Sequence, residues 1–190
     1  MIKKNYLKDL NKSKKPFIIY RSNKGFDLYT NFSKKIFLTK NNIEKFINQS
    51  TKLKSKNKET DLFIGFFGYE ILNNLIGIKI KKQKGLKFPK GIFYKPESKI
   101  KLPKKINYKN LETIRSNKIF KININKASYK VIFDKFKKKI KSGETYQIKI
   151  CTKYSNETQI DALDFFCRLV KSNMAPEAFM IKDKDYSIIS

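Results

Sequence analysis

The clearest pattern of apolar and polar positions lies in the last third of the chain. Ile132, Phe136 and Ile140 recur four residues apart, so they fall on one face of an amphipathic helix. Ser128 can cap the start of that helix, and Gly143 stands where a residue in the left-handed conformation commonly ends one. The spacing therefore predicts a helix that begins at Ser128 and ends at Gly143.

The period then changes from that of a helix to that of a strand. Polar and apolar residues alternate from Tyr146 to Tyr154, which predicts a strand whose first residue lies in the core. Gln147 falls on the opposite face, where it is either a structural amide or a group that lines a site. A second amphipathic helix is predicted to start at Asn156 or Thr158 and to end at 171–173.

Short apolar runs separated by turn residues predict most of the other strands. We expect strands at 15–22, 26–29, 36–39, 92–94, 99–102 and 119–124. The first three of these form an antiparallel meander. Near the end of the chain, 179–181 and 186–189 flank a four-residue turn, a pattern that favours a hairpin. A short helix carries Ile43, Phe46 and Ile47 on one face.

The densest apolar run of the chain, Leu62–Glu70, contains Gly65 and Gly68. Glycine within such a run marks a place where backbones pack closely or bend. A P-loop lysine does not follow, so we interpret both residues as packing glycines rather than as phosphate binders. Glu70 is either an acid that faces a partner or a carboxylate at the start of a helix, and we favour the second interpretation because the helix dipole stabilises a carboxylate there.

Composition and charge narrow the choice of partners. The 190 residues suffice for one domain, or for one domain and part of another. Lys and Arg outnumber Asp and Glu by 44 to 16, a formal net charge of +28. Only three of the basic residues are arginine, whereas proteins that read base edges rely on arginine. We therefore predict a solvated lysine surface and no specific nucleic-acid partner.

The sequence also limits location and chemistry. No apolar run approaches the roughly 18 residues of a membrane span, and Met1–Lys15 lacks the apolar core of a secretory signal. We therefore expect a cytoplasmic protein with no membrane partner. The chain has no histidine, which removes the commonest general base and any Cys/His zinc site. Cys151 and Cys167 are interpreted as reduced core residues.

Four segments resemble motifs of one enzyme family, in the order in which that family carries them. Lys141–Ile148 resembles its "aGDiYQv" segment, Asn173–Phe179 its "NPaPya" stretch, Gly65–Glu70 its "GyfGYd" motif and Phe17–Ser22 its N-terminal "fLLeS" strand. The family is component I of anthranilate synthase and of aminodeoxychorismate (para-aminobenzoate) synthase, whose members bind chorismate. The resemblance covers nearly the whole chain.

The resemblance implies an α+β fold in which antiparallel β-sheets pack together with helices on the outside. It implies an Mg²⁺-dependent replacement of a chorismate hydroxyl by ammonia, which a glutamine amidotransferase subunit or domain (component II) supplies from glutamine. It divides the chain into an N-terminal domain, 1–124, and the beginning of the chorismate-binding domain, 125–190. We expect the catalytic and Mg²⁺-binding residues beyond residue 190, so none is assigned here, and residues 1–190 alone are expected to be inactive.

A pocket for a regulatory amino acid is also implied by the resemblance. In members that tryptophan regulates, the serine of the N-terminal motif and the Asn-Pro-x-Pro stretch line a tryptophan pocket. This pocket maps to Ser22, Asn173, Ala175 and Pro176. From residue types alone, Ser22 can equally end a strand, and Asn173 and Pro176 can simply stop a helix.

Three departures from the family's pattern bear on this pocket. Arg21 stands where the family usually has glutamate, Met174 replaces the first proline, and Glu177 replaces an aromatic residue. A carboxylate attracts the α-ammonium group of an amino acid, whereas a guanidinium repels it. The substitution at Arg21 therefore argues against regulation by tryptophan.

The sequence leaves the product and the class of function open. The Asn-x-Ala-Pro stretch leans toward aminodeoxychorismate, and the serine strand leans toward anthranilate. A second hypothesis is a non-catalytic module that binds a glutaminase subunit or a small ligand. A third hypothesis, less favoured because of the dispersed lysines, is a basic nucleic-acid-binding domain.

Overall fold

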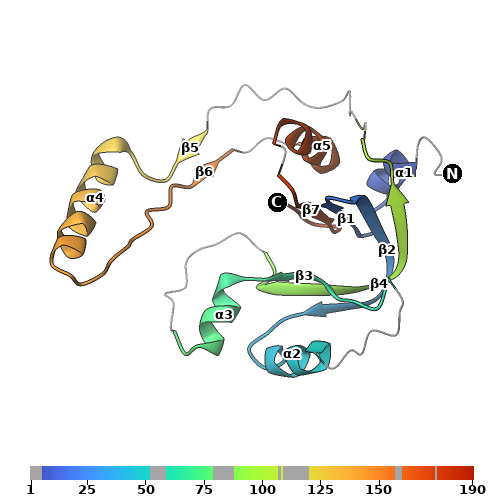
Figure 1. Cartoon of the computed structure of the whole chain (residues 1–190), viewed down its shortest axis with the longest axis horizontal. Coiled ribbons are helices and arrows are strands. Elements are labelled where there is room, and N and C mark those ends of the chain that lie inside the picture. Colours follow the sequence, from blue (N-terminus) through green and yellow to red (C-terminus); the bar gives the residue numbers. More distant parts are fainter. Residues whose placement is uncertain are drawn as a thin grey trace. The chain divides into compact units, whose positions relative to one another are not determined.

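The computed structural model describes residues 6–51, 59–78, 88–106, 108, 120–156, 160–173 and 175–190. The chain divides into a first unit, Met1–Asn110 with Asp161–Ser190, and a second unit, Leu111–Ile160. The fold is α+β, as expected (Figure 1). The described elements, in chain order, are α1 Tyr6–Lys12, β1 Phe17–Ser22, β2 Gly25–Phe37, α2 Ile43–Thr51, β3 Ile64–Phe67, α3 Tyr69–Leu75, β4 Gly91–Leu102, β5 Lys121–Ile122, α4 Lys126–Lys141, β6 Tyr154–Ser155, α5 Ala162–Ser172, β7 Ala178–Lys182 and β8 Ser187–Ile189.

Six antiparallel strands of the first unit form one sheet, in the order β3-β4-β2-β1-β7-β8. The predicted strand 15–22 and the predicted C-terminal hairpin are confirmed as β1 and as β7 with β8. The first two strands of the predicted meander do pair antiparallel, as β1 and β2. Its third strand is wrong, because Ile36 and Phe37 belong to the same long strand as 26–29, β2, which ends at Phe37. In the same way β4 contains both of the segments that were predicted as separate strands between residues 92 and 102.

A bulge in the middle of β2 explains why one strand looks like two in the sequence. The register with β4 shifts between Phe32 and Lys34, and Asn31 takes a positive φ of 52°, which asparagine tolerates better than most residues. The polar residues around the bulge mimic the composition of a turn. Figure 1 shows β2 and β4 bending together, so that the sheet is curled.

The two faces of this curled sheet hold different apolar clusters. On one face, the core side chains of β1, β2 and β7 pack against Leu163 and Phe166 of α5, with α1 at its margin. On the other face, Ile18 and Ile181 pack with Tyr29 and with the part of β4 that contains Tyr94. Alternate residues of each strand point to opposite faces, so both sides of the sheet are apolar along β1 and β7.

A third cluster surrounds the far end of β4. Ile43 and Phe46 of α2 and Ile71 of α3 pack against Phe93, which confirms the predicted apolar face of the short helix. Glu70 lies in the first turn of α3, as predicted. No helix among the described residues is long and apolar enough to cross a membrane.

The second unit departs furthest from the sequence-based expectations. The predicted helix is confirmed as α4, but its N-cap is Asn125, whose side chain accepts a hydrogen bond from the Ser128 N–H at 2.8 Å. Gly143 has the predicted positive φ, 76°. Its N–H bonds to the carbonyl of Ile140, and the next N–H bonds to that of Lys139, so the carbonyls of the last turn are satisfied.

The predicted strand after Gly143 is wrong over most of its length. Only Tyr154–Ser155 pairs, with Lys121–Ile122 of β5. Tyr146, predicted to be core, is 92% exposed, and Cys151 is exposed as well, although Cys167 is partly buried as expected. Alternation predicts a strand only where a neighbouring strand supplies hydrogen bonds, and the described residues supply one only at this end.

The start of the following helix was also predicted wrongly. The helix α5 begins at Ala162, because Asp161 is its N-cap and accepts a hydrogen bond from the Asp164 N–H at 2.8 Å. The alternative start at Asn156 lies outside any helix, and Thr158 lies outside the described residues. The predicted end is confirmed, since Asn173 is the C-cap. The domain boundary between residues 124 and 125 stays a prediction.

Replacing Gly65 tests whether β3 packs closely against β4 at the edge of the sheet. A Cβ at Gly65 would lie 1.9 Å from the carbonyl oxygen of Ile92, a backbone atom that cannot move aside. We expect Gly65→Ala to lower the free energy of unfolding by about 3 kcal/mol, the upper end of usual overpacking effects. Chemical denaturation monitored by circular dichroism measures this loss.

Gly77→Ala is the matched control. Gly77 has a positive φ of 74° but no atom within 4 Å of an added Cβ. Its replacement should therefore cost only the roughly 1–2 kcal/mol of the left-handed conformation. A loss at Gly65 no larger than that at Gly77 would contradict close packing of β3 on β4.

Candidate functional site

The predicted pocket residues lie at the end of β1 and along the segment that leads from the end of α5 to the start of β7. Ser22 is the last residue of β1, and its Oγ accepts a hydrogen bond from the Lys24 N–H at 3.2 Å. Asn173 caps α5 by donating its backbone N–H to the Leu169 carbonyl at 2.8 Å. Ala175 and Pro176 follow in the connection to β7. These contacts are the strand-ending and helix-ending roles that the residue types also suggested.

The register of the sheet brings these residues to one end of it. The strand β7 begins at Ala178, which pairs with Arg21 of β1. The connection that contains Ala175 and Pro176 therefore approaches the sheet where β1 ends, at Ser22. Gln147, in contrast, belongs to the second unit, where it is exposed and lies outside any strand.

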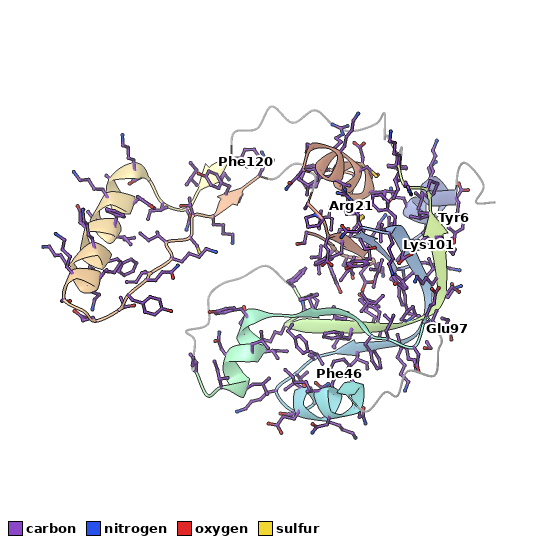
Figure 2. The ribbon with its side chains drawn as sticks, in the orientation of Figure 1. Tyr6, Arg21, Phe46, Glu97, Lys101 and Phe120 are labelled. Atoms are coloured by element: carbon purple, nitrogen blue, oxygen red, sulfur yellow. The ribbon has the colours of Figure 1, made fainter. Side chains whose placement is uncertain are left out.

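Arg21 and Ser22 point to opposite faces of β1, because successive residues of a strand alternate. The residues that pair with Arg21 are Phe26 and Ala178, and both belong to the apolar cluster under α5. The Nη1 atom of Arg21 is buried and has no hydrogen-bond partner in the part of the chain that the structure describes. The guanidinium thus occupies the α5 side of the sheet (Figure 2).

A polar cluster occupies the face on which Tyr20 lies. We define it as Tyr20 of β1, Asp27 of β2, and Lys99 and Lys101 of β4. Tyr20 pairs with Asp27, and Asp27 pairs with Lys101 across adjacent strands. The Asp27 carboxylate is buried and forms ion pairs with the ammonium groups of Lys101 at 2.6 Å and of Lys99 at 3.5 Å.

The two tyrosines beside this carboxylate, Tyr20 and Tyr29, have raised pKa values, which favours their neutral form. Burial raises the pKa of Tyr20, and a hydrogen bond with Glu177 raises it further. Burial also raises the pKa of Tyr29, with the negative charge of Asp27 acting in the same direction. Glu177 immediately precedes β7, so its contact with Tyr20 links the α5–β7 connection to the polar cluster.

This arrangement can hold charged groups. The carboxylate of Asp27 is already neutralised by two lysines, of which Lys101 is 58% exposed at its side chain. The sequence has no histidine. Among the described residues no three Asp, Glu, Cys or His side chains gather as a metal site. The ionic groups here can position a charged ligand or fix the strands.

Sequence reasoning missed the polar cluster because its members are far apart in the chain. One signal was present, namely a carboxylate at Asp27 inside the apolar run Phe26–Tyr29. A charged residue within a buried strand requires a partner of opposite charge. The partners, however, are lysines some 70 residues away, and the chain has too many lysines to choose from.

The position of Arg21 yields a test of its role. A buried donor without a partner costs about 1–3 kcal/mol. Arg21→Met keeps the apolar stem and removes that donor, so we expect the free energy of unfolding to rise by about 1 kcal/mol. Thermal denaturation should therefore show a higher midpoint for this variant.

Arg168→Met is the control with the opposite expected sign. The Arg168 guanidinium lies 2.6 Å from the carboxylate of Asp164, which is buried. Its loss removes an ion pair from that carboxylate and should lower the midpoint. A lower midpoint for Arg21→Met as well would mean that the Arg21 guanidinium stabilises the fold.

Comparison with known proteins identifies the family. No curated protein matches this sequence. The family model described as chorismate binding enzyme matches residues 4–190, which include all four motif segments, both units, and the strands and connection around Ser22. Because the match covers nearly the whole chain, the protein belongs to the family of chorismate-binding enzymes.

Proposed function

We propose that this chain is the N-terminal part of a component I synthase that aminates chorismate, with anthranilate or aminodeoxychorismate as the product. The observation that carries the proposal is the family match over residues 4–190. It supports a chorismate-utilising enzyme of the synthase type. The four motif segments support the component I subtype within that family.

The local geometry of the motif residues supports the proposal further. In Lys141–Ile148, Gly143 takes the left-handed conformation that ends α4. In Gly65–Glu70, Gly65 and Gly68 lie against the backbone of β4 and of Lys90, where a Cβ would come within about 2 Å of a carbonyl oxygen. Each of these three glycines thus occupies a position whose backbone conformation or packing favours glycine.

The proposal includes a glutamine amidotransferase as the source of ammonia, and magnesium as the metal. Magnesium prefers several oxygen ligands in octahedral arrangement. Within the part of the chain that the structure describes, no three Asp, Glu, Cys or His side chains gather as a metal site. The proposal therefore assigns magnesium binding to no residue of this chain. It places the protein in the cytoplasm, where its substrate and partner would have to occur as well.

One alternative fits the same observations. A chain without the commonest general base, and with no metal cluster among its described residues, also fits a non-catalytic module that binds a glutaminase subunit or a small ligand. The two functions differ in one measurable property, which is consumption of chorismate by the complete gene product.

The test is an assay of chorismate consumption with ammonia and magnesium. We expect the polypeptide translated from the complete open reading frame to consume chorismate and residues 1–190 alone to be inactive. Anthranilate is detected by its fluorescence, and aminodeoxychorismate by coupling to a lyase that releases para-aminobenzoate. Replacing ammonia by glutamine and a purified amidotransferase subunit tests the partner.

Two results would count against the proposal. Turnover by residues 1–190 would mean that the catalytic groups lie within this chain. A folded complete product that consumes no chorismate, yet binds the amidotransferase, would favour the non-catalytic module.

A further inference from the structure

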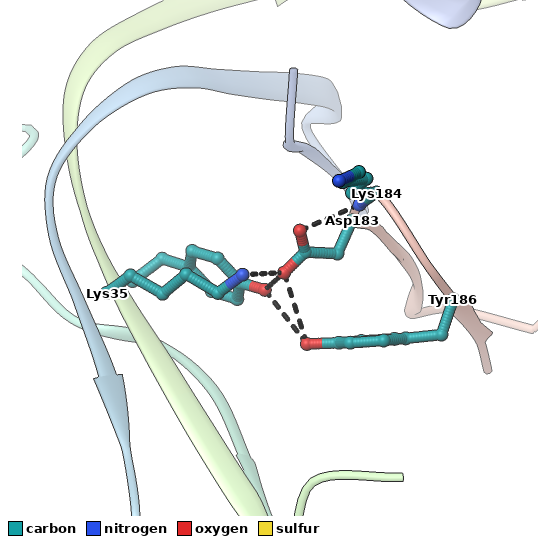
Figure 3. Close-up of polar contacts among 5 residues, drawn as sticks. Lys35, Asp183, Lys184 and Tyr186 are labelled. Carbon is teal, nitrogen blue, oxygen red and sulfur yellow. Dashed lines mark hydrogen bonds and ion pairs between the residues drawn. The ribbon is translucent and has the colours of Figure 1, made fainter. Parts of the chain in front are cut away.

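A second polar cluster lies at the turn between β7 and β8, away from the end of the sheet that holds Ser22. The carboxylate of Asp183 accepts a hydrogen bond from the Tyr94 hydroxyl and lies 2.5 Å from the Lys35 ammonium (Figure 3). The Tyr186 hydroxyl lies 3.0 Å from that of Tyr94 and 3.3 Å from the carboxylate. The Lys184 N–H donates to the other carboxylate oxygen at 2.7 Å.

The strand order shows that the Tyr94–Asp183 hydrogen bond depends on the curl of the sheet. Tyr94 belongs to β4, whereas Asp183 directly follows β7, and both β2 and β1 lie between those strands in the sheet. Neighbouring strands are about 4.8 Å apart, so three spacings in a flat sheet would separate β4 from β7 by about 14 Å. Side chains that stand perpendicular to a flat sheet would not meet over that distance. The hydrogen bond thus requires the curled form of the sheet.

The register shows where the curl brings these strands together. The pairing of β1 with β7 ends at Phe17 and Lys182, just before the turn. The paired strands β2 and β4 continue past that point, bend at the bulge near Phe32, and carry Lys35 opposite Tyr94. The turn of the hairpin therefore lies against the bent halves of β2 and β4.

This polar cluster is buried, yet its carboxylate is charged. Asp183 is 7% exposed and Tyr94 is fully buried. The ring centroid of Phe32 lies 5.0 Å from that of Tyr94, and the ring centroid of Phe88 lies 5.1 Å from that of Tyr186. Burial alone would raise the pKa of Asp183, but the hydrogen bonds from Lys35 and Tyr94 hold it below its ordinary value. The carboxylate is therefore held in its charged form.

We propose that Lys35, Tyr94, Asp183 and Tyr186 form a latch that closes the curl of the sheet. The latch fastens the β7–β8 turn to the bent halves of β2 and β4. When it opens, the turn separates from β4, while the hydrogen bonds between β1 and β7 persist. The hairpin is thus a strap with one end fixed by backbone pairing and the other by a releasable ionic contact.

Hydrogen exchange in residues 1–190 tests the latch. The Asp183 N–H bonds to the Tyr186 carbonyl at 2.9 Å and reports on the turn, whereas the amides of β1 report on its pairing with β7. Asp183→Asn should accelerate exchange of the turn amides by about tenfold, as expected for the loss of hydrogen bonds to a charged group. The amides of β1 should change much less.

Asp185→Asn is the matched control, because it removes the same charge from an exposed position of the same turn. It should leave exchange unchanged. Tyr186→Phe provides a second variant that keeps the ring beside Phe88 and removes only the hydroxyl. Faster exchange spread equally over β1 and the turn would overturn the proposal, and so would unchanged exchange at the turn in both Asp183→Asn and Tyr186→Phe.

The pH dependence gives an independent measurement. The pKa of Tyr186 is raised to about 12; burial is the largest cause, the Asp183 and Asp185 charges act in the same direction, and a hydrogen bond with Tyr94 opposes them. Burial and the hydrogen bond with Asp183 also raise the pKa of Tyr94. Because both phenols favour the neutral form when folded, their contribution is complete below the unfolded value of roughly 10 and is lost as the pH rises above it.

Protonation of the Asp183 carboxylate weakens the same contact at low pH. The folded pKa of Asp183 is depressed, so its contribution is complete above the unfolded value of roughly 3.9 and is lost as the pH falls through the folded value. We expect turn exchange, corrected for its intrinsic pH dependence, to accelerate below about pH 4, before exchange in β1 does. Simultaneous acceleration of both at that pH, as in global unfolding, would overturn the latch.

Discussion

The bend in the paired strands β2 and β4 is the constraint on which the first unit depends. These two strands pair from Phe26 to Phe37, and the bulge between Phe32 and Lys34 divides the pairing into two halves. One half joins β1 and β7, and its apolar face receives α5. The other half joins β3 and receives α2 and α3. Without the bend, the second apolar cluster, which combines Ile18 with Ile92, could not form.

The buried carboxylates help to specify which strands of the sheet lie together. Three acidic side chains of the described residues are buried, and each has a cation close by. Asp27 pairs with Lys101, Asp164 with Arg168, and Asp183 with Lys35. Buried ion pairs are weak evidence for stability, because desolvation offsets much of their attraction. Here the Asp27–Lys101 pair joins the neighbouring strands β2 and β4, and the Asp183–Lys35 pair joins the turn after β7 to the distant part of β2. These two pairs therefore specify which strands meet and are not an argument for a large gain in stability.

At the candidate site, the charged side chains are paired with one another. The end of the sheet at Ser22 combines a paired carboxylate, two lysines and a tyrosine, with the connection through Ala175 and Pro176 beside it. These groups can hold a charged ligand or hold strands together. Family membership supplies the link to chorismate, and it rests on the whole chain rather than on any single side chain.

The sequence by itself determined the elements whose formation depends on near neighbours. The apolar spacing of Ile132, Phe136 and Ile140 sufficed for α4, Gly143 for its end, and the turn after Lys182 for the C-terminal hairpin. These features rest on backbone conformation and on contacts within a few residues. The family motifs were recognisable for the same reason, since they are contiguous.

Only the tertiary structure decided the features that depend on distant partners. The segments 26–29 and 36–37 became one strand because β4 pairs with both across a bulge, and the alternating segment after Gly143 stayed largely unpaired where described residues offered no neighbour. The partners of Asp27 and Asp183 could not be chosen in advance among 41 lysines. Periodicity records which face of an element is apolar, but the pairing of strands and charges is fixed by the packing of the whole unit.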